Sequence, residues 1–421
     1  NDMVGRDGLE LSYDDVLRGH DGQKHVEIDA LGREKRIIFE ERPQDGKSLR
    51  LTIDKTLQEK SEEVLRQWME RFNTTRGVVI LSDPKTGFIK SLVSMPSYDN
   101  NVFAKGISSE AYQELLADED RPLFHRALKG EYPSGSTIKP FIGAAALKEG
   151  VVDAKTTFLS SGGIRVGRWF FPDWKAGGHG VTNLAKALAE SVNTYFYLIG
   201  GGSESVNGLG IERMASMLRV FGFGVPTGID LRGEENGFIP SPDWKIKTKG
   251  EPWYIGDTYH VAIGQGDVLV TPLQIHTATS LFANAGIAYQ PMLVAALEDP
   301  DGRRVEQQPR IQTQEILTQE HIQNIRDGMK RAVTEGSARR LSLLPVSAAG
   351  KTGTAQWHTE KKPHAWFAGW APFEDPEVMI TVLVEEGEEG SKSAIGIAYD
   401  ILSWYFRDRH VDSQGARIDI E

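Results

Sequence analysis

The chain has 421 residues, of which 39% are hydrophobic and 25% are charged, so it is long enough for one large folded domain and a smaller one. With 59 Asp and Glu against 48 Lys and Arg, its net charge of −11 argues against nucleic acid as the main partner. It contains no cysteine, which excludes disulfides, CxxC redox chemistry and thiolate catalysis.

The N-terminal part of the chain predicts a small appendage followed by a helix. The first ten residues are polar, and no stretch approaches the roughly 18 apolar residues that span a bilayer, so we expect an excised ectodomain. Within 5–46, strand-like pieces at 25–28 and 36–40 alternate with charged and glycine-containing turns, which predicts a mostly β unit. An amphipathic helix is predicted at 56–72, with Asp54 as its cap.

The remaining elements predict one antiparallel sheet that is built from both ends of the chain. A hairpin is expected from β-rich runs at 77–81 and 88–93, and the region 121–258 is expected to be helical with long glycine-containing loops. The later expected elements are a helix at 271–285, strands at 348–357, 365–370 and 378–384, and a helix at 394–406. Two early and three late strands flanked by helices indicate an α+β fold, followed by a polar tail after Asp408.

A serine and a lysine three residues apart precede an alanine-rich helical run at 141–147. If Ser136 begins that helix, Lys139 lies on the same face and its amine can take the hydroxyl proton. The positive helix end and a second nearby lysine would lower the pKa of Lys139. A helix-starting serine with a solvated lysine has the same pattern. A second copy, from Ser82 to Lys85, has proline at its third position and is interpreted as a hairpin turn.

A Ser-Val-Asn tripeptide also occurs twice. Ser191 and Asn193 lie between helical apolar segments, where a short rigid break can direct a hydroxyl and an amide into a cleft. Ser205 begins the other copy, inside the glycine-flanked run 200–208, which is typical of a loop or a helix cap. We therefore prefer Ser191 as the functional copy, because a motif is judged by its context.

A Lys-Thr-Gly-Thr sequence lies in a strand-like run near the C-terminus. Strand alternation predicts Lys351 and Gly353 on one face and Thr352 and Thr354 on the other. Glycine leaves room for a substrate backbone, while hydroxyls and an ammonium suit a terminal carboxylate. A lone Lys-Thr-Gly is also a common turn, as the copy that starts at Lys85 illustrates.

The three motifs, in this order, resemble the set found in penicillin-binding proteins and serine β-lactamases. Over nearly its whole length the chain is similar to class B penicillin-binding proteins, in particular the elongation-type penicillin-binding protein 2 group. The stretches that carry this likeness are 8–10, 13–19, 51–54, 221–224, 227–231, 239–244, 264–266, 271–274 and 364–367. The resemblance implies a serine β-lactamase/D,D-peptidase-like fold. It divides the chain into a partial pedestal (1–47), a transpeptidase domain (48–410) and a polar tail (411–421).

The resemblance also implies roles for the motif residues. Ser136 is the expected nucleophile, Lys139 its base, and Ser191 a proton relay. Lys351 is grouped with these catalytic residues, and the expected substrate-binding residues are Asn193, Thr352, Gly353 and Thr354. The backbone N–H groups of Ser136 and Thr354 would form the oxyanion hole. The implied reaction is attack on a D-Ala-D-Ala stem peptide, release of D-Ala and acyl transfer to a neighbouring amine, with β-lactams as covalent inhibitors.

The resemblance further implies the surroundings of the protein. Its partners would be peptidoglycan stem peptides, β-lactams and a membrane glycan polymerase of the shape, elongation, division and sporulation family. The location would be the extracytoplasmic face of the bacterial cytoplasmic membrane, with the anchor absent here. No cofactor is expected. The ten histidines form no HExxH pattern. Asp173 and His179, in one loop, are the candidate metal ligands, but loop histidines are often structural, so no metal site is expected.

Three other functions share the same chemistry. A serine β-lactamase would need a second base to activate water, and no Glu stands in a recognisable deacylation motif. A β-lactam sensor domain would be acylated and stay so, but such sensors lack a pedestal like 5–46. A D,D-carboxypeptidase uses water as the acceptor with the same motifs, so only the overall likeness favours a transpeptidase.

Overall fold

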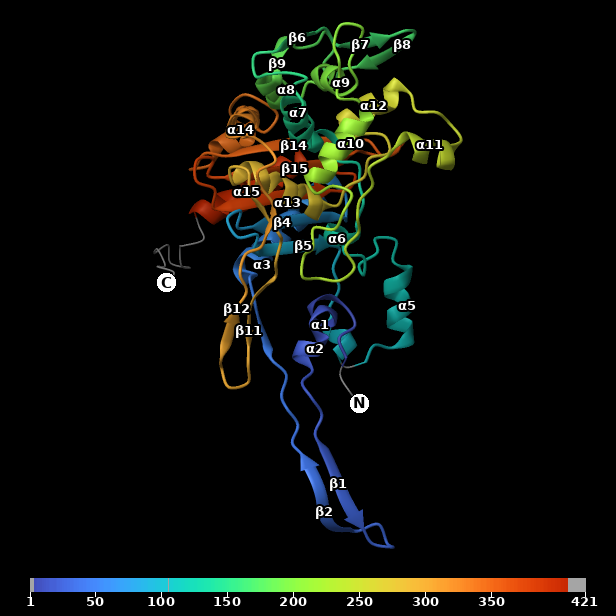
Figure 1. Ribbon diagram of the computed structural model, residues 1–421, viewed down its shortest axis with the longest axis vertical. Helices are drawn as coiled ribbons and strands as arrows, with labels where there is room; N and C mark the ends of the chain where they lie inside the picture. The colour runs from blue at the N-terminus through green and yellow to red at the C-terminus, as the bar shows by residue number, and fades with distance from the viewer. Residues whose placement is uncertain (1–3, 105, 408–421) are drawn as a thin grey trace.

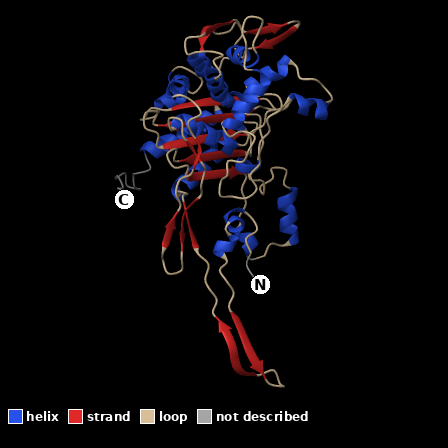
Figure 2. Ribbon diagram, viewed as in Figure 1, coloured by secondary structure: helices blue, strands red, loops and turns tan. Residues whose placement is uncertain are grey.

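The computed structural model describes residues 4–104 and 106–407. Its centre is a five-stranded antiparallel sheet in the order β14-β15-β16-β4-β5 (Figures 1 and 2). The strands are β4 (Gly77–Ser82), β5 (Ile89–Met95), β14 (Ala349–Ala355), β15 (His364–Ala371) and β16 (Val378–Val384). The early and late strands meet where β16 pairs with β4, with Val382 opposite Val79. The predicted sheet from both ends of the chain is therefore confirmed.

The sheet separates two hydrophobic cores. Side chains alternate along β4, so Val78 and Ile80 belong to one core and Val79 and Leu81 to the other. Every residue of β4 and β16 is buried, which explains why these strands read as continuous apolar runs. Strand β5 lies at the edge and alternates between buried and half-buried positions.

Two helices cover one face of the sheet, α3 (Lys55–Phe72) and α15 (Ser393–Arg407). The predicted cap is confirmed, because the Asp54 side chain accepts a hydrogen bond from the N–H of Leu57. The two helices approach closely at Gly396, where a Cβ atom would lie 2.1 Å from the Trp68 ring. This layer covers the second core. The remaining large helices lie on the opposite face of the sheet.

A larger helical layer covers that opposite face (Figure 1). It contains α6 (Arg126–Lys129), α7 (Lys139–Lys148), α8 (Leu184–Glu190), α9 (Asn193–Gly201), α10 (Gly210–Val220), α12 (Ile255–Ala262), α13 (Pro272–Ala283) and α14 (Gln319–Thr334). Helix α13 packs on β15 and β16, and α14 packs on β14, α7 and α8. Helix α7 lies in the middle of the larger of the two hydrophobic cores.

The helical expectation for 121–258 is corrected by four short strands. Strand β6 (Thr157–Ser160) pairs with β9 (Gly180–Asn183), and β7 (Gly163–Val166) pairs with β8 (Trp169–Pro172). Each strand has only four residues and the connections are rich in glycine, so no alternating pattern is long enough to read from the sequence. These two strand pairs form a lobe at the end of the molecule beside α8 and α9 (Figure 1).

The N-terminal appendage extends away from the body (Figure 1). Its strands β1 (Gln23–Ile28) and β2 (Glu34–Glu41) contain the predicted pieces at 25–28 and 36–40, and neither strand has a buried residue. Two short helices precede them, α1 (Gly8–Ser12) and α2 (Asp14–Leu17), which the sequence did not indicate.

The appendage is joined to the body through β3 and a tyrosine. Strand β3 (Ser48–Leu51) forms a small sheet with β11 (Val294–Glu298) and β12 (Arg304–Glu306). The Tyr13 hydroxyl donates to Asp230 Oδ2 at 2.9 Å, and Asp230 also accepts hydrogen bonds from the N–H groups of Leu293 and Val294. One carboxylate thus ties the appendage to the strand that β3 pairs with.

The remaining described elements are shorter or peripheral. They are α4 (Asn101–Ala104), α5 (Ser109–Ala117), α11 (Pro242–Lys249), β10 (Ala288–Tyr289), β13 (Ile311–Thr313) and the 3₁₀ helices η1 (Gly135–Ile138) and η2 (Arg339–Leu343). No helix in the described ranges combines the length and the apolar character needed to cross a bilayer. The predicted polar tail, including 411–421, lies outside the described residues.

Candidate active site

Ser136 lies in η1, directly before α7, and Lys139 is the first residue of α7. The predicted helix start is therefore confirmed, with one 3₁₀ turn in front of the helix. Gly135 has a φ of +52°, and a Cβ atom there would lie 2.7 Å from the Thr354 carbonyl oxygen. Only glycine both adopts this backbone conformation readily and lets η1 lie directly against β14. Ser136 is half-buried, and no hydrogen bond involves its Oγ within the described ranges.

Lys139 is completely buried and joins the first two motifs. Its Nζ donates to Asn193 Oδ1 at 2.6 Å and to the Ser191 carbonyl oxygen at 2.9 Å, and it lies 3.3 Å from Ser191 Oγ. A solvated lysine, the competing interpretation of the motif, is thereby excluded. The three contacts place the serine and the amide of the second motif around the amine of the first.

Ser191 owes its position to a break between two helices. It has a left-handed backbone, φ 58° and ψ 42°, and caps the C-terminus of α8, while α9 begins two residues later at Asn193. Such a conformation is uncommon for a residue with a side chain and needs support from its surroundings. The predicted short rigid excursion between helical segments is confirmed.

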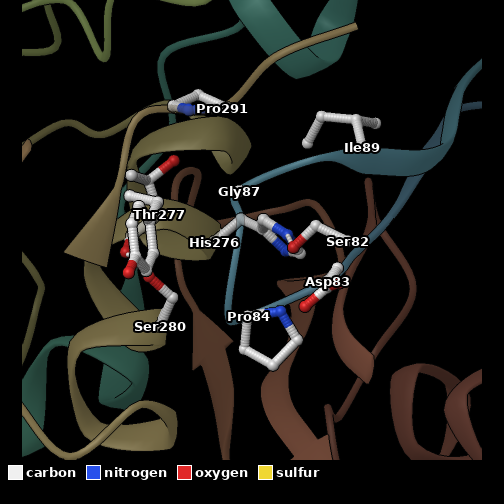
Figure 3. Close-up of a pocket in the computed structure, with 10 residues that line it drawn as sticks. Ser82, Asp83, Pro84, Gly87, Ile89, His276, Thr277, Ser280 and Pro291 are labelled. Carbon is white, nitrogen blue, oxygen red and sulfur yellow. Dashed lines mark hydrogen bonds between the residues drawn. The ribbon is translucent and has the colours of Figure 1, made fainter. Parts of the chain in front are cut away.

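Neither repeated motif belongs to this site. Ser82 shares a hydrogen bond of 2.7 Å with His276 Nε2, next to the turn of Asp83 and Pro84 (Figure 3). Lys85 forms an ion pair with Asp375 on the surface. Ser205 is exposed within an isolated turn. These positions agree with the interpretation of the Ser82 copy as a hairpin turn and of the Ser205 copy as a loop.

The third motif lies on β14 with its side chains on alternate faces, as predicted. Gly353 faces η1, where a Cβ atom would lie 2.9 Å from the Ser134 carbonyl oxygen. Thr352 Oγ1 instead shares a hydrogen bond of 2.6 Å with Ser337 Oγ, and Thr354 Oγ1 accepts one of 3.2 Å from the N–H of Gly390. Lys351 is buried, and its Nζ donates to the Thr352 carbonyl oxygen at 3.0 Å.

The backbones proposed for the oxyanion hole are neighbours. The same Cβ position on Gly135 that nearly touches the Thr354 carbonyl lies 3.1 Å from the Thr354 nitrogen. The residue before Ser136 is therefore packed against the Thr354 peptide. Backbone N–H groups held at such a close contact are the kind of donor that stabilises an oxyanion.

The electrostatics favour an uncharged lysine at this site. Burial is the main cause that holds the pKa of Lys139 well below its usual range, and the charge of Lys351 is the second. Asp173 acts in the opposite direction. Burial also lowers the pKa of Lys351 to about 7. A neutral amine is the form that can accept a hydroxyl proton, so the lowered pKa makes Lys139 a candidate general base.

Asp173 supports the second motif from behind. Its carboxylate accepts hydrogen bonds from the N–H of Asn193 at 3.1 Å and from the N–H and hydroxyl of Thr194 at 2.8 and 2.6 Å. It therefore holds the first turn of α9, and with it the amide that contacts Lys139. The sequence singled out Asp173 only as a possible metal ligand. The only sequence feature that points to this role is the position of the Asp173 loop, shortly before Ser191.

His179 lies beside Asp173. Its Nε2 is 3.7 Å from Asp173 Oδ1, and its Nδ1 is 2.6 Å from Glu190 Oε2. No group of three or more His, Asp or Glu side chains in the described part of the chain is arranged to hold a metal ion.

A half-buried serine one turn from a buried lysine, with a second serine and an amide around that lysine, defines the active-site-serine class of acyl-transfer folds. Comparison with known proteins narrows this class. Residues 77–403 match the penicillin binding protein transpeptidase domain, and residues 1–51 match the penicillin-binding protein dimerisation domain. The chain belongs to the penicillin-binding protein transpeptidase family.

Individual relatives cover nearly all of the chain. It is 36% identical to the peptidoglycan D,D-transpeptidase MrdA of Haemophilus influenzae over 96% of its own length and 63% of that protein. It superposes with a TM-score of 0.83 on PBP2 of Helicobacter pylori, solved in a complex with MreC, at 33% identity over 96% of this chain and 72% of that one.

A third relative is part of an assembly. A chain of a peptidoglycan synthase complex, described as coordinating polymerization and crosslinking, has a TM-score of 0.83 and 32% identity over 95% of this chain and 70% of that one. The present chain spans about three-fifths of the length of the curated relatives it matches first.

We predict opposite pH shifts when the two charges that act on Lys139 are removed. Lys351→Met removes a positive charge, so the pKa of Lys139 should rise and the ascending limb of acylation rate against pH should move to higher pH. Asp173→Asn removes a negative charge, so the limb should move to lower pH. Stopped-flow acylation by a chromogenic cephalosporin measures both limbs. Shifts in the same direction would contradict this electrostatic assignment.

We also predict that the two Ser-Val-Asn copies differ sharply in importance. Ser191→Ala removes a hydroxyl 3.3 Å from Lys139 Nζ and should slow acylation by about 10²-fold or more, in the range of a lost proton-transfer group. Ser205→Ala is the matched control, since it changes the same residue type in an exposed turn. Equal effects of the two substitutions on the acylation rate would refute the choice of Ser191.

Proposed function

We propose that this chain is the catalytic part of a peptidoglycan D,D-transpeptidase of cell elongation. The observation that carries the proposal is the contact of buried Lys139 with Ser191 and Asn193, one turn from Ser136. The family membership and the transpeptidase name of the relatives support the same reaction. The proposal divides the chain into an appendage at 1–47 and a catalytic unit at 48–410.

The proposed first half-reaction is acylation. Neutral Lys139 takes the proton of Ser136, whose oxygen attacks the carbonyl carbon between the two terminal D-Ala residues of a stem peptide. The N–H groups of Ser136 and Thr354 stabilise the oxyanion. Ser191 passes the proton to the leaving nitrogen, the C–N bond breaks and D-Ala departs. Asn193, whose backbone N–H donates to Asp173, would hold the donor backbone with its side-chain amide.

The second half-reaction transfers the acyl group to an amine. A neighbouring stem peptide's amine attacks the ester carbon and gives a proton to Lys139. The ester C–O bond then breaks, Lys139 returns that proton to the Ser136 oxygen, and the product leaves with its new amide bond. Lys351 and β14 would receive the carboxylate of the donor. Thr354 Oγ1 accepts from Gly390, so its own proton remains available for that carboxylate. A β-lactam would acylate Ser136 by the same first half-reaction, and no cofactor is required.

The decisive test is the site of covalent labelling. Incubation with penicillin should add the mass of one inhibitor to the peptide that contains Ser136, and Ser136→Ala should abolish the label. Ser82→Ala is the matched control and should leave labelling unchanged, because Ser82 bonds with His276 away from the site. A label on Ser82 would refute the assignment.

Turnover then separates the related functions. Fast release of a chromogenic cephalosporin would indicate a β-lactamase, and D-Ala release without amide formation would indicate a carboxypeptidase.

We infer further that the appendage couples this unit to a membrane glycan polymerase of the shape, elongation, division and sporulation family, at the extracytoplasmic face of the cytoplasmic membrane. The relatives in the MreC complex and in the synthase complex support assembly of this kind. The hairpin β1–β2 has no buried residue, so the catalytic body does not need it for its own core. The Tyr13–Asp230 hydrogen bond gives the appendage a fixed joint.

We predict that charge reversals on the hairpin, Lys35→Glu with Glu41→Lys, leave penicillin acylation intact but reduce stimulation of the polymerase in a reconstituted full-length pair. Both side chains are exposed, so the fold should tolerate the change. Lys148→Glu with Lys247→Glu, exposed on the catalytic body, is the control. Full stimulation by a protein that lacks 1–47 would leave the appendage a structural support only.

A further inference from the structure

The lobe formed by β6–β9 and β7–β8, residues 157–183, exposes an unusual number of large apolar side chains. Those more than half exposed are Leu159 (67%), Trp169 (63%), Phe170 (53%), Trp174 (63%) and Val181 (66%). Isolated exposed apolar residues are ordinary, but a concentration of them in one segment indicates a binding surface.

Strand β8, which carries two of these exposed aromatic side chains, is anchored to the catalytic body. Phe171 follows Trp169 and Phe170 in β8, and it packs edge-to-face on Tyr259 with ring centroids 4.9 Å apart. Tyr197 donates to the Pro172 carbonyl oxygen at 3.2 Å. Strand β8 is thus anchored through Phe171 while its neighbours Trp169 and Phe170 point outward. A rigid aromatic surface loses little entropy when it binds a ligand.

The lobe is continuous with the candidate active site. Trp174 Nε1 donates to the Glu190 carbonyl oxygen at 3.1 Å, and Glu190 directly precedes Ser191. The Trp174 backbone N–H donates to Asp173, the carboxylate that holds Asn193. A ligand that covers the lobe would therefore reach the rim of the proposed reaction centre.

The charge of the lobe is opposite to that of the whole chain. Its basic residues Arg165, Arg168 and Lys175 are exposed, and its one acidic residue, Asp173, is buried, whereas the chain carries a net charge of −11. The Arg168 guanidinium lies 5.0 Å from the Trp169 ring centroid, and the Arg165 guanidinium lies 5.6 Å from that of Phe170. The surface thus alternates flat aromatic faces with fixed positive groups.

We propose that this lobe binds a glycan strand of peptidoglycan that bears acidic stem peptides, and so delivers a polymeric substrate to the site. Aromatic faces stack on sugar rings, and arginine pairs with the carboxylates of stem peptides. A membrane is a poorer match for the lobe. The proposed membrane partner is assigned to the appendage, and the lobe lies at the opposite end of the molecule from the β1–β2 hairpin of that dimerisation region (Figure 1). The inference rests on the proposed function, since it names the form of the substrate.

The test is co-sedimentation of the full chain with purified sacculi, measured without turnover. Trp169→Ala with Phe170→Ala should reduce retention about tenfold, as expected for a pair of aromatic contact residues. The control is Ile38→Ala with Phe39→Ala, which removes two exposed apolar side chains from the hairpin at the other end and should not alter retention. Penicillin acylation should be unchanged in both variants, which reports that the site remains folded.

Further binding and kinetic measurements identify the ligand. Glycan strands stripped of stem peptides should still bind, more weakly and with less dependence on salt. The specificity constant for a soluble stem peptide should be equal in variant and wild type, while cross-linking of polymeric strands falls. Unchanged retention on sacculi, or a loss confined to anionic lipid vesicles, would overturn the inference. Failure of the proposed function would instead appear as a wild-type chain that binds sacculi but is not acylated at Ser136.

Discussion

The burial of Lys139 is the constraint on which the functional half of this structure depends. An ammonium removed from water is costly unless it is paired, and here the groups around Nζ are neutral oxygens of Ser191 and Asn193, with Lys351 nearby. The energetic result is a lysine that readily gives up its proton. The same three contacts force the break between α8 and α9 to lie against the start of α7. A surface lysine at this position would lose both the chemistry and the geometry.

The sheet supplies the other wall of the site. The glycines at the contact, Gly135 on η1 and Gly353 on β14, let two backbones meet without intervening side chains. Because β14 is bonded along its length to β15, the Thr354 peptide is held rigidly beside Ser136. A preorganised backbone of this kind suits oxyanion stabilisation, since no reorganisation is needed during the reaction. In the proposed mechanism the helices would provide the proton chemistry, and the sheet would provide the fixed dipoles.

The lobe and the N-terminal appendage extend from the catalytic body in opposite directions (Figure 1). Asp173 connects the second motif to the lobe with Trp174, so any ligand there is linked to the position of Asn193 through a single carboxylate. Asp230 connects the appendage, through Tyr13, to the small sheet that leads into α3. Both links are hydrogen bonds to a carboxylate, and both join segments far apart in the chain. The catalytic body therefore lies between the lobe, which we propose faces the substrate, and the appendage, which we propose takes part in assembly.

The sequence by itself determined the five-stranded sheet, the helices α3, α13 and α15 and the order of the three motifs, because long apolar periodicities and short motifs are local features. Local context also separated Ser136 from Ser82 and Ser191 from Ser205. It did not reveal the four-residue strands of the lobe, which are too short to show a period, or the helices α1 and α2. The burial of Lys139, the hydrogen bonds from Asp173 to α9 and the contact between Gly135 and Thr354 were decided only by the tertiary structure. Each joins residues that are distant in sequence, and depends on how the packed helices and the sheet meet in space.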